Sequence, residues 1–170
     1  MMACASLVQP PSADPGCDRV FYVSPAFTAA EQSALARAAT RWNEIATEKF
    51  CTQVTNQIQE RHWIYRIPYK GPAWQEISTR LKGADVLGVY YESGDRIGII
   101  DGMNGGLFEL VALHEFGHAH GLDHTAKHAI MYVGSGTVTD FTPIDLAECR
   151  RVLACVADES QQEEDSNGGH

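Results

Sequence analysis

Apolar residues near the start of the chain recur three and four positions apart, which is the spacing of one helix face. Between residues 29 and 49 they are Leu35, Ala38, Ala39, Trp42, Ile45 and Ala46. Thr28 and Glu31 precede this run as a capping box, in which each side chain bonds the backbone amide of the other residue. The pattern predicts an amphipathic helix from about residue 29 to residue 49.

Short runs rich in Val, Ile and Tyr occur between turn-forming residues and predict β-strands. The expected strands are residues 19–24, 62–67, 86–91 and 96–100. The turn over residues 92–95 suits a hairpin between the last two strands. Further helices are expected over residues 73–82 and from Thr142 to about residue 156. Thr142 and Pro143 provide the last helix with an N-cap and a first-turn proline.

The two ends of the chain lack this periodicity. Residues 1–18 contain Pro10-Pro11 and Pro15-Gly16, and we expect a flexible lead-in there. Residues 157–170 are polar and acidic, which predicts a disordered tail. One folded domain is therefore expected over residues 19–156, in agreement with a total length of 170 residues.

The most informative stretch is residues 114–124, which read HEFGHAHGLDH. If this stretch is helical, His114 and His118 lie one turn apart on the same face and can bind one metal ion. Gly121 can end the helix in the left-handed conformation, so that the chain turns and His124 returns as a third ligand. Three imidazoles with one open position are typical of a catalytic zinc site.

Glu115 would lie beside such a metal without being needed as a ligand. A zinc ion lowers the pKa of its bound water and polarises a substrate carbonyl. Glu115 is then placed to take the water proton as a general base and to pass it to the leaving amine. The stretch predicts a zinc-dependent endopeptidase with one catalytic ion. A buried helix with incidental histidines is the alternative, and it explains the spacing less well.

These residues resemble the signature HExxHxxGxxH of the metzincin metallopeptidases, which a Met-turn follows. The candidate Met-turn is Ala129-Ile130-Met131-Tyr132, and its tyrosine resembles the matrixin version. The resemblance implies that Met131 forms a hydrophobic floor beneath the zinc. It also implies that Tyr132 lines the pocket for the side chain after the cleaved bond. Residues 141–148 resemble the start of the last matrixin helix.

The resemblance implies an α/β (α+β) fold of the metzincin-type zincin domain. Such a catalytic domain has a small twisted mixed sheet, three helices and an active-site cleft. In that family the strand before the active-site helix is the antiparallel edge of the sheet and binds extended substrate. Residues 96–100 occupy this place, so Arg96, Gly98 and Ile99 are expected to contact substrate. The alternative is that this strand pairs internally.

The expected partner is a protein or peptide substrate bound as an extended strand, and a monomer is expected. A net charge of -9, with 13 Lys and Arg against 22 Asp and Glu, argues against nucleic acid. No apolar run is long enough to cross a bilayer. A second hypothesis is a zinc-containing binding module that holds a partner strand without cleaving it.

The remaining histidines are expected to have lesser roles. On a helix His120 points about 200 degrees away from His118, so it should lie at the surface or support a ligand. His128 precedes the Met-turn and could lie near the site. Only His62 precedes His114, so the structural zinc site of matrixins cannot be assembled in the same form. No loop carries carboxylates at the spacing of a calcium site.

The five cysteines fit no zinc ribbon or redox motif. Disulfides in a secreted or cell-surface protein are one interpretation, and small buried thiols are the other. Cys4 is expected to be unpaired, and lipid anchoring through it is a weaker alternative. Cys149 and Cys155 fall on different faces of the predicted helix, so we expect each to pair elsewhere. Cys17 lacks the pattern of a matrixin cysteine switch, and a structural role is favoured.

Overall fold

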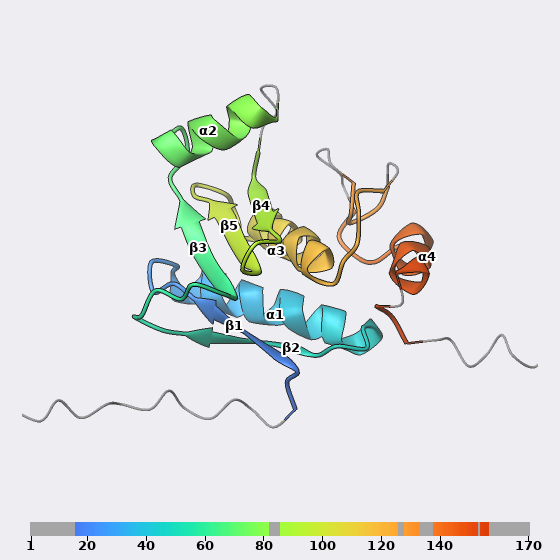
Figure 1. Ribbon diagram of the computed structural model, residues 1–170. Coiled ribbons are helices and arrows are strands. Elements are labelled where there is room, and N and C mark those ends of the chain that lie inside the picture. Colours follow the sequence, from blue (N-terminus) through green and yellow to red (C-terminus); the bar gives the residue numbers. More distant parts are fainter. Residues whose placement is uncertain (1–15, 82–85, 126–127, 133–137, 153, 157–170) are drawn as a thin grey trace, which may run out of the picture.

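The computed structural model describes residues 16–81, 86–125, 128–132, 138–152 and 154–156. These residues form a five-stranded sheet and four helices (Figure 1). The predicted acidic tail and most of the predicted lead-in, including Cys4, lie outside the described residues.

The sheet is mixed and has the strand order β2-β1-β3-β5-β4. Its strands are β1 (Arg19–Val23), β2 (Phe50–Val54), β3 (Trp63–Ile67), β4 (Gly88–Tyr91) and β5 (Arg96–Ile100). All neighbouring strands are parallel except β4, which runs antiparallel to β5. The mixed sheet predicted from the sequence is thus confirmed.

The sequence does not predict β2. This strand lies at one edge of the sheet, where only one neighbour is needed, and its residues do not alternate cleanly between apolar and polar. Phe50 is buried whereas Val54 is exposed. A disulfide between Cys17 and Cys51 joins β2 to the residues before β1, and it confirms that Cys17 has a structural role.

The helices are α1 (Ala29–Ile45), α2 (Pro72–Arg80), α3 (Gly105–Ala119) and α4 (Pro143–Arg151). The expected domain has three helices. The described residues form four, because the short helix predicted over residues 73–82 also forms, as α2. The capping box of Thr28 and Glu31 is present at the start of α1.

The first helix ends at Ile45, four residues before the predicted end. Ala46 is extended, with ψ of 151°, and starts the turn into β2. Lys49 donates a hydrogen bond of 2.7 Å to the carbonyl of Ala46 and another to that of Asn43. A cation is favourable at this end of a helix, so the side chain of Lys49 stabilises the stop.

The core lies between the sheet, α1 and α3. One continuous apolar cluster contains residues of all three elements, among them Phe21, Leu35, Trp42, Ile64, Ile99, Leu113 and Phe116. The rings of Phe21 and Phe116 meet edge to face with centroids 5.3 Å apart. Trp42 donates a buried hydrogen bond of 2.7 Å to the carbonyl of Leu113, so α1 holds α3 at the level of the histidine motif.

The prediction that residues 96–100 form the sheet edge is wrong. These residues form β5, which pairs with β3 on one side and with β4 on the other, so β4 is the edge. The burial of four consecutive residues, 97–100, follows from this position. A continuous apolar run is typical of an internal strand, so Ile97, Ile99 and Ile100 carry the signal that could have corrected the prediction.

The chain after α3 leads to α4 at the right of Figure 1. Its described residues between 121 and 156 are called the lower segment, and several of them, among them Met131 and Cys149, belong to the same core cluster. Cys149 and Cys155 form a disulfide with each other, contrary to the prediction. The physical reason is that α4 ends at Arg151, so Cys155 lies beyond the helix. The chain turns there, and the amide of Ala154 bonds the carbonyl of Cys149.

A membrane-spanning helix was not expected. Of the helices that the structure describes, none has the length and apolar character needed to cross a bilayer.

Candidate metal centre

Two of the three predicted ligands lie on α3. Asn104 caps this helix by accepting a hydrogen bond of 2.9 Å from the amide of Leu107. The helix then buries a wide apolar surface, which fixes its rotation and leaves His114 and His118 facing the open side. Gly121 follows with φ of 85°, a conformation that favours glycine, and the chain reverses.

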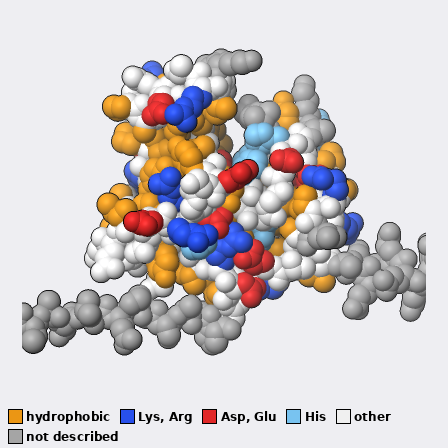
Figure 2. Space-filling view, in the orientation of Figure 1, with side chains coloured by type: hydrophobic (Ala, Val, Ile, Leu, Met, Phe, Trp, Pro, Cys, Tyr) orange, Lys and Arg blue, Asp and Glu red, His pale blue; other side chains and the backbone are white. Residues whose placement is uncertain are grey.

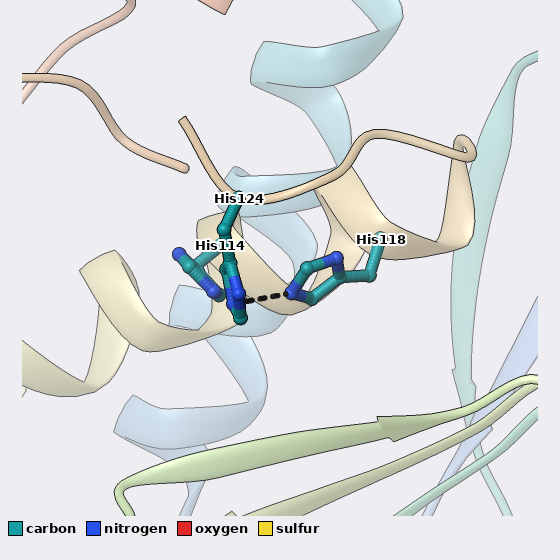
Figure 3. A group of neighbouring side chains, drawn as sticks. All are labelled: His114, His118 and His124. Atoms are coloured by element: carbon teal, nitrogen blue, oxygen red, sulfur yellow. Dashed lines mark hydrogen bonds between the residues drawn. The ribbon is translucent and has the colours of Figure 1, made fainter. Parts of the chain in front are cut away.

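This reversal brings His124 to the other two histidines (Figure 3). One ligand nitrogen from each of His114, His118 and His124 lies within 4.8 Å of the others. The Nε2 atoms of His118 and His124 are 3.2 Å apart. Two nitrogen ligands of a tetrahedral zinc ion, each about 2.0–2.1 Å from the metal, would lie roughly 3.3 Å apart.

Hydrogen bonds fix the tautomers of the two helical histidines. The Nδ1 atom of His114 lies 2.8 Å from the carbonyl oxygen of Ile130, and that of His118 lies 2.8 Å from the carbonyl of Leu122. Carbonyls only accept hydrogen bonds, so each Nδ1 carries a proton, and in the neutral ring Nε2 then carries the lone pair. These contacts orient the rings as backbone partners orient metal-ligating histidines.

Burial favours the neutral form of the same two histidines. Burial lowers the pKa of His114 to about 4 and also lowers the pKa of His118. A neutral imidazole is the form that binds a metal ion. Three convergent imidazoles, two of them in the tautomer that directs Nε2 inward, therefore fit a zinc ion.

Glu115 lies next to His114 on the same helix and is almost fully buried, with 4 % of its surface exposed. Burial raises the pKa of its carboxyl group to about 8. Its Oε2 atom has no hydrogen-bond partner among the described residues. A buried carboxyl group with an unused oxygen beside a cation site is suited to take and release a proton.

Met131 packs against α3 at Gly117. It is fully buried, and a Cβ atom at Gly117 would overlap its Sδ atom. Gly117, which lies between the two helical ligands, therefore allows Met131 to approach the helix closely. This contact agrees with the expected floor of the site, although the Met-turn itself stays a prediction.

The sequence analysis missed the role of Asp145 in this region. This fully buried carboxylate accepts hydrogen bonds from the amides of Ile130, Met131 and Thr142, at 3.0, 3.0 and 2.9 Å. The sequence indicated only a first-turn acid of α4. The sequence feature that indicated a structural role for Asp145 is its position as the acidic member of a capping box with Thr142.

The edge strand β4 packs against α3 near His118. The ring of Tyr90 lies 6.4 Å from that of His118 at an angle of 19°, and its hydroxyl bonds Asp95. A hollow of about 300 Å³ opens there, lined among others by Tyr90, His118, Leu122 and Asp123. Figure 2 shows histidine atoms reaching the surface in the middle of this face.

The other predicted site residues lie in different surroundings. Gly98 and Ile99 are buried inside the sheet, and Arg96 packs over the ring of Tyr91 at 5.7 Å, so none of them lies on the free edge. Tyr132 is half-buried and pairs with Thr125, the residue after His124. Its predicted role in a substrate pocket stays a prediction.

His120 is not at the surface, contrary to one expectation. Its ring is buried and stacks on Phe50, with centroids 3.9 Å apart and an angle of 4°. The partner belongs to β2, which the sequence did not predict, so this burial could not be foreseen. His128 is exposed.

A comparison with protein families gives a match to the model of the Matrixin family over residues 72–139. The matched segment contains the three histidines, Glu115 and Met131. It confirms the resemblance to matrixins over these residues and supports a zinc metallopeptidase in general terms. The mixed sheet and the four helices are consistent with a matrixin-type zincin domain. A search of curated proteins finds no matching sequence.

Proposed function

Since residues 72–139 are matrixin-like, we propose that this protein is a zinc-dependent endopeptidase that hydrolyses peptide bonds of extended polypeptides. The observation that carries the proposal is the convergence of His114, His118 and His124 beside the buried carboxyl group of Glu115. The catalytic domain is proposed to span residues 19–156.

In this proposal the three imidazoles hold one zinc ion. The ion would supply a Lewis acid that favours ionisation of a water molecule and polarises the substrate carbonyl. Glu115 accepts the proton of the attacking water through Oε2, which has no hydrogen-bond partner among the described residues, and later donates it to the leaving amine. Burial, which moves the pKa of Glu115 towards neutrality, suits both transfers.

The substrate is proposed to bind along β4. One side of this strand pairs with β5, and its other side is the free edge of the sheet. An extended peptide can form main-chain hydrogen bonds with such an edge. This assignment moves the proposed substrate contacts from Arg96, Gly98 and Ile99 to the backbone of residues 88–91, with Tyr132 retained for the pocket after the cleaved bond.

Two disulfides occur among the described residues, and disulfides persist in oxidising compartments. We therefore place the proposed peptidase outside the cell or at its surface.

The test is cleavage of a diverse peptide library by the zinc-loaded protein, with Glu115→Gln as matched control. Glutamine keeps the shape of the side chain but cannot take the proton. We expect cuts by the wild type and a loss of roughly 10²–10⁴-fold in kcat/KM in the variant, with unchanged zinc content. Folded, zinc-loaded wild type that binds peptides without cutting them would overturn the proposal in favour of a binding module.

A further inference from the structure

The edge strand and the active-site helix pack closely together. Alternate residues of a strand face the same side, and in β4 the side towards α3 carries Gly88 and Tyr90. Tyr90 lies near His118, and Gly88 lies against Val111 and Glu115. The residue of β4 that faces the proposed catalytic carboxyl group is thus a glycine.

A side chain at position 88 would not fit. A Cβ atom built there would lie 2.5 Å from Oε1 of Glu115, 2.7 Å from Cγ1 of Val111 and 2.9 Å from Cγ of Glu115. Real Cβ atoms almost never have neighbours closer than 3.0 Å. The φ angle of Gly88 is not in the left-handed region, so its backbone conformation does not require glycine. Its missing side chain is explained by the space that Glu115 occupies.

The three groups around this space differ in how easily they can move. The strand β4 is held by four residue pairs to β5. Val111 is β-branched and buried within a helix, where one rotamer is strongly preferred. The carboxyl group of Glu115 ends a longer side chain, and its Oε2 atom has no partner among the described residues. Glu115 would therefore move first.

We infer that Gly88 is a positioning residue, which keeps open the space that holds the carboxyl group of Glu115 in place. An added Cβ would displace this group, and none of the three atoms nearest to it belongs to a histidine. The kinetic consequence rests on the proposed function, but the steric coupling between residues 88 and 115 does not.

A double-mutant cycle on the zinc-free protein tests the coupling through the melting temperature. Gly88→Ala should lower Tm by about 5 °C in the wild-type background. In a Glu115→Ala background two of the three close contacts are gone, so the loss should fall to less than half. Gly98→Ala is the matched control, because its Cβ would meet Ile67 and Val89 but not Glu115. It should cost the same in both backgrounds.

The kinetic arm uses the zinc-loaded enzyme and a peptide cut by the wild type. Gly88→Ala should lower kcat roughly 10- to 100-fold, because a misplaced base is costly, while KM stays within about twofold. Gly98→Ala should leave kcat within about twofold of the wild type. Equal Tm losses for Gly88→Ala in both backgrounds, or a raised KM with unchanged kcat, would overturn the inference. An inactive wild type would refute the proposed function and leave the thermal cycle as the test.

Discussion

Asp145, in the first turn of α4, accepts a hydrogen bond of 3.0 Å from the backbone amide of Ile130. The carbonyl of the same Ile130 lies 2.8 Å from Nδ1 of His114. The buried carboxylate of Asp145 is thus connected through one residue to His114 of α3, a proposed metal ligand. Partners of this kind commonly tune metal affinity although they never touch the metal.

Asp145→Asn should weaken zinc binding by roughly 10- to 100-fold. The amides of Ile130 and Met131 bond different oxygens of Asp145. Asparagine offers only one acceptor oxygen, so one of these two amides loses its partner and the segment that holds His114 shifts. Zinc affinity can be measured by competition with a chromophoric chelator. Asp140→Asn is the control, because Asp140 is exposed and pairs with Arg41. Equal zinc affinities for the wild type and Asp145→Asn would refute this link.

Zinc should stabilise the folded protein. A ligand that binds only the folded state at 100 times its Kd adds about 2.7 kcal/mol, which corresponds to a rise of roughly 5–10 °C in Tm for a domain of this size. Thermal melts with zinc and with excess chelator measure the shift. His118→Ala should lose it, whereas His128→Ala, which changes an exposed histidine, should keep it. A shift that survives in His118→Ala would place the ion elsewhere.

Acid should destabilise the protein through His120. Burial lowers the pKa of this ring to about 3, whereas an unfolded chain has a histidine pKa of about 6.5. Below pH 6.5 the unfolded state therefore binds the extra proton, and stability falls as the pH falls. The contribution from pH 7 to pH 5 is about 2 kcal/mol.

His120→Phe keeps a planar ring against Phe50 but cannot bind a proton. Urea unfolding of both zinc-free proteins at pH 7 and pH 5 isolates the contribution of His120, because the other histidines are common to both. The variant should lose about 2 kcal/mol less than the wild type over this range. Equal losses of unfolding free energy in both proteins would show that the pKa of His120 is not lowered by folding.

The two disulfides should differ in their effect on stability. Cys17 and Cys51 are 34 residues apart in sequence, whereas Cys149 and Cys155 are six residues apart. Loop-closure entropy gives about 4 kcal/mol for the longer loop and about 2 kcal/mol for the shorter one. Double Cys→Ala variants of each pair, unfolded in urea, measure both losses. A larger loss for the 149–155 pair would contradict this order.

The sequence predicted best what depends on near neighbours. His114 and His118 are one helical turn apart, and the stop at Gly121 returns His124, so local geometry brings the three histidines together. The capping residues of α1 and α4 were predicted for the same reason.

What the sequence predicted poorly depends on residues far along the chain. The burial of His120 requires Phe50 of a strand that pairs only with β1. The pairing of Cys149 with Cys155 depends on where α4 ends. The space beside Glu115 is visible only once β4 has been placed across α3, because the predicted strand over residues 86–91 does not by itself show which residue of α3 faces Gly88.

After α4 the chain returns to α1, and this contact restricts motion of the lower segment relative to α1 and α3. Ala46 and Cys155 form an antiparallel bridge, in which the amide of Val156 bonds the carbonyl of Ile45 at 3.0 Å. The lower segment is thereby fastened at its far end as well as at the end of α3. A segment held at both ends cannot rotate freely as a rigid body, so the residues between α3 and α4 that carry His124 and Met131 keep a fixed position relative to α1 and α3.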